Sequence, residues 1–188
     1  MASSSRITDP RRLDVGAFAA AHGELAGAWA QDGFARLASV ALPGDAQAQP
    51  VRWRVAGERA ALAGAGAGAQ PALRIEADTV VTLECQRCLG PMQTPLHIER
   101  RLFFVEGEDA AAALDAESEE DVLALTPSLD LHALIEDELL LSLPIVPRHE
   151  ICAAPIDLGA GRETLPDDEA REHPFAALAA LKRSPRPN

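Results

Sequence analysis

The chain has 188 residues, of which 47% are apolar, 24% charged and only 4% aromatic, and its formal net charge is −12. This length suits one domain with tails. Because no apolar run reaches the ~18–20 residues that a membrane-spanning helix needs, a transmembrane segment is excluded. The polar start lacks the apolar stretch of a secretory signal, so we expect a cytoplasmic protein.

Negative charge is concentrated in the second part of the chain. Residues 1–105 carry 11 basic and 10 acidic side chains, whereas residues 106–188 carry 6 basic and 19 acidic ones. An acidic surface repels phosphate backbones, which disfavours binding of nucleic acid through the whole surface. A local basic face in the first part and a basic protein partner for the second both remain compatible with this distribution.

The first seventy residues predict three short elements between polar or glycine-rich segments. Residues 1–12 are polar and predict a flexible N-terminus. The alanine-rich stretch 13–30 predicts a short helix, and the apolar stretch 34–42 predicts a strand. In residues 51–55, VRWRV, apolar side chains alternate with arginines, which indicates a strand with one apolar and one cationic face. The alanine–glycine repeat within 57–71 predicts a flexible loop.

The clearest pattern is a pair of longer segments with alternating polarity. In residues 73–85 the apolar side chains occupy every second position, and the alternation resumes in residues 96–104. The connection between them contains CQRCLGP, with glycine and proline typical of a turn. Two such segments around a short turn predict an antiparallel hairpin.

The second part of the chain predicts one main helix among polar segments. Residues 106–121 are strongly acidic and predict a solvated loop. Residues 129–143, LDLHALIEDELLLSL, predict a helix of good helix formers. Residues 153–172 predict a linker, 173–182 a short amphipathic helix that must dock on another surface, and 183–188 a tail.

Together these elements predict an α+β fold. Strands followed by one long helix indicate an antiparallel sheet of about four or five strands, either open or closed into a barrel. The main helix lies in the C-terminal half, with short helices flanking the sheet. We expect a single domain over residues 13–152.

Three cysteines and one histidine form two pairs with the spacing of metal ligands. Cys85 and Cys88 lie in the predicted hairpin turn, and His149 and Cys152 follow the predicted helix. A spacing of two residues lets both side chains of a pair reach one tetrahedral ion, and four protein ligands would make a structural zinc site. The alternatives are a redox pair, which normally sits at a helix N-terminus, and three inert buried thiols.

Four arginines on the predicted strands form a candidate RNA-binding face: Arg52, Arg54, Arg74 and Arg101. In this interpretation they contact phosphates. In the alternative they are ordinary solvated strand residues, because acidic side chains on the same strands dilute their charge. The scarcity of aromatic residues argues against a stacking platform for single-stranded nucleic acid.

Glu138 lies on the apolar stripe of the predicted helix, where a carboxylate needs a partner. The structural interpretation is a salt bridge to an arginine such as Arg87 or Arg100, and the functional one is a general acid or base. The sequence contains no phosphate-binding loop, nucleophile elbow or HExxH motif, so it predicts a protein that is not an enzyme.

Three separated segments resemble the bacterial YceD family, the large ribosomal RNA subunit accumulation proteins. They are VTLECQRCLGP, DLHALIEDELLLSLPIVPRHEIC and HPFAALAALK, and the resemblance extends over roughly residues 13–182. It marks Arg87, Leu89, Glu138 and Pro144 as motif positions beside the cysteines and the histidine. The resemblance transfers no catalytic role to any of them.

The resemblance implies a cytoplasmic factor for the synthesis, processing or stability of large-subunit ribosomal RNA. The expected partner is a ribosomal protein or the pre-ribosomal large subunit. One alternative is a direct RNA-binding module that uses the arginine-bearing face. Another is an RNA-processing hydrolase built on Glu138 and the Cys/His cluster.

Overall fold

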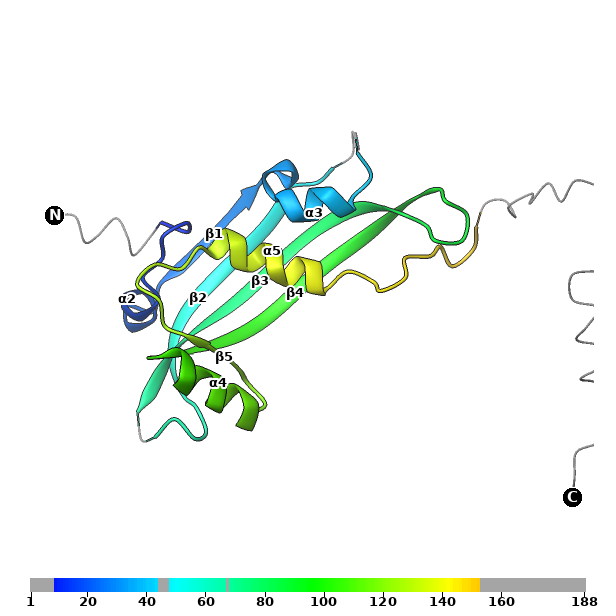
Figure 1. Ribbon diagram of the computed structural model, residues 1–188. Coiled ribbons are helices and arrows are strands. Elements are labelled where there is room, and N and C mark those ends of the chain that lie inside the picture. The colour runs from blue at the N-terminus through cyan, green and yellow to red at the C-terminus, as the bar shows by residue number, and fades with distance from the viewer. Residues whose placement is uncertain (1–8, 44–47, 67, 153–188) are drawn as a thin grey trace, which may run out of the picture. The chain divides into compact units, whose positions relative to one another are not determined.

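The computed structural model describes residues 9–43, 48–66 and 68–152 (Figure 1). The elements in chain order are α2 (Val15–Ala20), β1 (Glu24–Trp29), the 3-10 turn η1 (Gln31–Gly33), α3 (Ala35–Val40), β2 (Val51–Ala61), β3 (Ala69–Glu84), β4 (Pro91–Val105), α4 (Glu108–Glu117), β5 (Asp121–Ala124) and α5 (Leu131–Leu141).

The five strands form one open sheet in the order β1-β2-β3-β4-β5. All neighbours are antiparallel except β4 and β5, which are parallel. Figure 1 shows α3 and α5 lying across one face of this sheet. The α+β prediction is therefore confirmed, and of the two predicted forms of the sheet the open one is observed.

The main core lies between the sheet and these helices. Alternate residues of β2, β3 and β4 point into it, as the period-2 pattern predicts, and the helices contribute Phe18, Leu37, Ile135 and Leu139. A second, smaller cluster is formed by Leu62, Ala72, Phe103, Val105, Ala111 and Val122, and α4 covers it. Consecutive residues Phe103 and Phe104 belong to different clusters because successive strand side chains point to opposite faces.

Of the two elements predicted near the N-terminus, the first is right only in part and the second is wrong. The stretch 13–30 forms helix only over α2 and then becomes strand β1, whose Trp29 stacks on Trp53 of β2 with ring centroids 4.4 Å apart. The stretch 34–42, predicted as a strand, contains helix α3. Its buried residues Phe34 and Leu37 are three apart, a helical spacing that the apolar composition concealed.

The two predicted loops are also largely wrong. Most of 57–71 belongs to β2 and β3. Position 57 requires glycine, because a Cβ would lie 2.7 Å from the Phe18 ring and 2.9 Å from the Phe18 carbonyl oxygen. Within 106–121, α4 forms because Glu108 and Asp109 occupy its first turn, where acidic side chains favour the helix dipole, and Ala111 is buried.

The main helix is confirmed as α5. Asp130 caps it, with Oδ1 accepting hydrogen bonds from the backbone N–H groups of His132 and Ala133. The predicted linker 153–172, docking helix 173–182 and tail 183–188 lie outside the described residues. Among the described helices, none combines the length and apolar character required to cross a membrane.

Candidate metal centre

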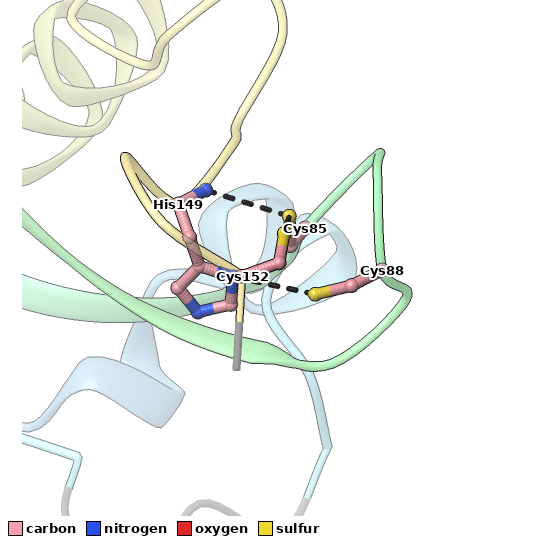
Figure 2. Close-up of side chains that lie close together, drawn as sticks. All are labelled: Cys85, Cys88, His149 and Cys152. Atoms are coloured by element: carbon pink, nitrogen blue, oxygen red, sulfur yellow. Dashed lines mark hydrogen bonds between the residues drawn. The ribbon is translucent and has the colours of Figure 1, made fainter. Parts of the chain in front are cut away.

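The two predicted ligand pairs meet at the tip of the β3–β4 hairpin. Cys85 directly follows β3 and Cys88 lies in the turn, while His149 and Cys152 lie in the irregular segment after α5 (Figure 2). One ligand atom from each of the four residues lies within 4.8 Å of all the others. The structure thus brings together side chains that are more than 60 positions apart, which the spacing alone could not establish.

Backbone hydrogen bonds build this tip. Within the first pair, the N–H of Cys85 donates to the carbonyl of Gly90 at 2.9 Å and the N–H of Leu89 to the carbonyl of Cys85 at 2.8 Å. The N–H of Gln86 donates to the carbonyl of Pro147 at 2.9 Å, which fastens the second segment to the first. Leu89 has φ = 56°, a left-handed conformation that a leucine seldom adopts.

The distances among the four side chains suit a tetrahedral ion. The Sγ atoms of Cys85 and Cys152 are 3.9 Å apart, and Cys88 Sγ is 3.4 Å from Nδ1 of His149. Zinc bonds of about 2.3 Å to sulfur and about 2.0–2.1 Å to nitrogen give tetrahedral edges of about 3.8 Å for S···S and about 3.6 Å for S···N. The donor set is therefore close to the geometry that zinc requires.

His149 is oriented by a contact on its far side. Its Nε2 lies 3.1 Å from the carbonyl oxygen of Pro91, so this nitrogen carries the proton and donates. Nδ1, which faces Cys88, is then the nitrogen with the free lone pair. Fixing the ring in this way is the usual arrangement of a metal-binding histidine.

The pKa values of Cys85 and Cys88 are shifted in opposite directions. Burial alone would raise the pKa of Cys85, but backbone N–H groups of His149, Arg87 and Cys88 outweigh it and lower the pKa to about 5. The backbone N–H of Gly90 favours the thiolate of Cys88, yet neighbouring Cys152, burial and Cys85 together raise its pKa. Several thiolates this close repel one another, and a bound cation would relieve that repulsion.

Glu138 forms the salt bridge that was one of its two predicted roles. Its Oε2 accepts a hydrogen bond from Nε of Arg100 on β4 at 2.9 Å, and its side chain is 13% exposed. Arg87, the other predicted partner, instead reaches the second ligand segment.

The most buried carboxylate of α5 is Glu136, which the sequence analysis missed. Its Oε1 accepts hydrogen bonds from the backbone N–H groups of Arg36 and Leu37 at 2.7 and 3.2 Å, and its Oε2 accepts from Nε of Arg36 at 3.1 Å. Glu136 therefore caps the first turn of α3 from another helix. The available signal was its spacing of four from His132, which is also buried.

The four arginines of the candidate RNA-binding face lie on the sheet face opposite α3 and α5, the face whose other end α4 covers. The strand register places Arg52 beside Asp78, Arg54 beside Glu76, and Arg74 beside Arg101. Arg101 is paired with Glu58 at 2.8 Å. A hollow of about 380 Å³ lies over β1 and is lined by both Arg52 and Arg54 and their acidic neighbours. Cationic and anionic groups are thus mixed on this face.

Comparison with known proteins finds relatives that match this part of the chain. The family model described as "Large ribosomal RNA subunit accumulation protein YceD" matches residues 73–182. The Large ribosomal RNA subunit accumulation protein YceD of Haemophilus influenzae is 37% identical over 109 residues, which are 55% of this chain and 60% of that relative. The match thus covers less than two thirds of the relative's length. No solved structure matches the chain. Since the family model covers more than half of the 188 residues, including all four candidate ligands, the chain belongs to the YceD family.

Proposed function

We propose that this protein is a non-enzymatic factor for the synthesis, processing or stability of large-subunit ribosomal RNA, with a structural zinc ion at the β3–β4 tip. Family membership supports the role in RNA accumulation, because the relative's name states that role. The observation that carries the rest is the cluster of Cys85, Cys88, His149 and Cys152. Four protein ligands fill a tetrahedral ion and leave it no position for a substrate.

The surroundings of the cluster favour contact with a protein. The two ligand segments carry Leu89, Ile145 and Ile151, which are 64%, 100% and 88% exposed. A group of exposed apolar side chains in one region often marks a surface that binds another protein. A metal ion that joins the two segments would hold these side chains in a fixed arrangement.

The acidic region 106–121 supplies long-range attraction for a basic ribosomal protein. Glu108, Asp109, Glu117 and Asp121 are all exposed on or beside α4 and β5. Such a field raises the rate of encounter with a basic partner and is screened by salt. Association with ribosomal components should therefore weaken steeply as the salt concentration rises, and binding that is insensitive to salt would argue against this route.

The test of the function is affinity capture from lysate, with and without nuclease, followed by identification of the bound protein and RNA. We expect large-subunit ribosomal proteins to stay bound after nuclease treatment. The double variant Ile145→Ser/Ile151→Ser should lose them. Leu123→Ser should keep them, because this exposed apolar side chain of β5 pairs with Phe104, at the end of β4 away from the tip. Capture of no ribosomal component would refute the proposal.

The zinc site has its own test. Protein purified without an affinity tag should contain one equivalent of zinc, and the ion should be lost in Cys88→Ser and His149→Asn. His97→Asn is the matched control, because this histidine is exposed and pairs with Asp78 on the sheet. If the wild-type protein contains no zinc and Cys88→Ser does not change its stability, the four residues do not form a metal site.

Direct RNA binding through the arginine-bearing face is the second candidate. Arg52 and Arg54 are exposed and border the hollow over β1, which favours a phosphate contact there. Their acidic neighbours Asp78 and Glu76 argue against it. In the capture experiment, this candidate predicts that ribosomal material is released by nuclease and lost in Arg52→Glu/Arg54→Glu.

A further inference from the structure

Arg87 connects the two halves of the candidate metal centre. It lies between Cys85 and Cys88 in the chain, but its side chain extends to the second ligand segment. Its Nε donates to Sγ of Cys152 at 3.0 Å. Its Nη2 donates to the carbonyl oxygens of His149 and Glu150, at 2.9 and 3.3 Å.

We infer that Arg87 is a positioning residue of the metal centre, which fixes the geometry of the second ligand pair and supplies a cationic hydrogen-bond donor to Sγ of Cys152. This inference rests on the proposed zinc site. It concerns how the site is held together and not which residues are its ligands.

The geometric part follows from the shape of the guanidinium. A planar group with several N–H donors in fixed directions can bind one sulfur and two carbonyl oxygens at once. A lysine ammonium carries its donors on one nitrogen and lacks this rigid fork. Because the two carbonyls belong to His149 and its neighbour Glu150, these bonds fix the backbone between the ligands His149 and Cys152. The second pair is thereby held in ligand geometry before an ion arrives.

The electrostatic part follows from the ligand set. Three thiolates and one neutral imidazole around Zn²⁺ leave a net charge of −1. Backbone N–H groups stabilise the sulfur atoms of Cys85 and Cys88. For Cys152, the guanidinium of Arg87 is the donor, and its positive charge balances the excess negative charge of the complex.

Three substitutions separate these effects. Arg87→Met removes every donor, and Arg87→Lys keeps the charge and one donor for the sulfur but not the fork. Arg148→Met is the control, because Arg148 is an exposed arginine next to His149 that makes no hydrogen bond or ion pair within the described part of the chain. Arg87 is itself exposed, so its removal should leave the sheet and its core folded.

The experiment measures Zn²⁺ affinity by competition with a chromophoric chelator, and the spectrum of the fully loaded Co²⁺ form. Arg87→Met should bind Zn²⁺ about 10–100-fold more weakly than wild type, the usual effect of removing a partner of a metal ligand. Its thiolate-to-cobalt band should move to lower energy, because the sulfur loses its N–H donor. Arg87→Lys should largely restore the band but only part of the affinity, and Arg148→Met should match wild type.

The outcomes distinguish this inference from the proposed site. Wild-type protein that binds neither Zn²⁺ nor Co²⁺ would refute the metal centre itself. Wild-type binding with an Arg87→Met affinity within twofold, or with an unmoved cobalt band, would overturn the role of Arg87 and leave the metal centre intact. A merely structural loosening of the tip would lower affinity without moving the band of the loaded protein.

Discussion

Replacing Glu136 by glutamine should be the most destabilising single change of a charge in the described fold. The substitution keeps the size of the side chain, so it removes charge without leaving a cavity. In wild type the carboxylate receives two backbone N–H bonds at the start of α3 and the guanidinium of Arg36. The amide offers only one oxygen for these donors, and it carries no charge.

The magnitude follows from these bonds. Hydrogen bonds to a charged group contribute about 1.5–3 kcal/mol each and neutral ones about 0.5–1.5, so two weakened bonds lose about 2 kcal/mol. The pair with the Arg36 side chain, which is half exposed, adds less than about 1 kcal/mol. We therefore expect a loss of about 2–3 kcal/mol in the free energy of unfolding, or roughly 5–10 °C in Tm.

The effect should also depend on pH. Burial alone would raise the pKa of Glu136, but the N–H groups of Leu37 and Arg36 and the Arg36 side chain outweigh it, so the pKa is lowered in the folded protein. A lowered folded pKa gives stability that is present above the unfolded value of about 4.3 and is lost as the pH falls through the folded value. The advantage of wild type over Glu136→Gln should therefore be full at pH 7 and shrink below about pH 4.

Urea unfolding followed by the fluorescence of Trp29 and Trp53 would measure this difference. Asp137→Asn is the matched control, because Asp137 also pairs with Arg36 but is 52% exposed. It should cost less than about 1 kcal/mol. A Glu136→Gln protein within about 0.5 kcal/mol of wild type at pH 7, or an Asp137→Asn protein equally destabilised, would refute the reasoning.

Three other predictions concern the backbone and the tip. Gly57→Ala should destabilise by about 1–3 kcal/mol in thermal unfolding because its Cβ would meet both the ring and the carbonyl of Phe18, whereas Gly68→Ala meets nothing within 4 Å and should be neutral. Leu89→Gly should retain or slightly raise thermal stability, because glycine adopts φ = 56° without steric cost. It should also weaken ribosomal capture, because it removes an exposed apolar side chain. A clear loss of stability would contradict the first expectation. Treatment with a zinc chelator should increase the rate at which an alkylating reagent modifies Cys88 and Cys152, while the far-ultraviolet circular dichroism stays unchanged. Global unfolding on chelation would contradict the placement of the ion outside the core.

The parts of the fold that the sequence predicted correctly are those with a strong local pattern. Alternation along 73–104 predicts β3, β4 and their pairing, since the period of two survives whatever packs on the sheet. The segments 13–30 and 34–42 have small apolar residues that suit either element. Their outcome depends on distant partners, namely β2 for the strand and Glu136, 100 positions away, for the helix α3.

The error over the buried carboxylate was an error of helix phase. The predicted apolar stripe of α5 included Glu138, whereas the buried side chains of this helix are Leu131, His132, Ile135, Glu136 and Leu139. Two polar residues on the core side shift the stripe, because His132 stacks on Phe34 with centroids 3.9 Å apart and Glu136 caps α3. A pattern based on apolar residues alone cannot find a core face that contains satisfied polar groups.

The metal centre was predictable in its residues but not in its assembly, and the reason also bears on function. Each pair is local, so its spacing shows in the sequence, but the meeting of the pairs depends on α5 directing the following segment to the β3–β4 turn (Figure 1). Leu139 is the last buried core residue in the described part of the chain. Beyond Leu143, the segment that carries His149 and Cys152 is held to the hairpin by the hydrogen bond from Gln86 to Pro147, by Arg87 and by the candidate ligands. Loss of the ion should therefore release the exposed apolar side chains at the tip without unfolding the sheet. In this arrangement a bound metal would order the proposed interaction surface while the hydrophobic core holds the fold, so the two should be separable by mutation.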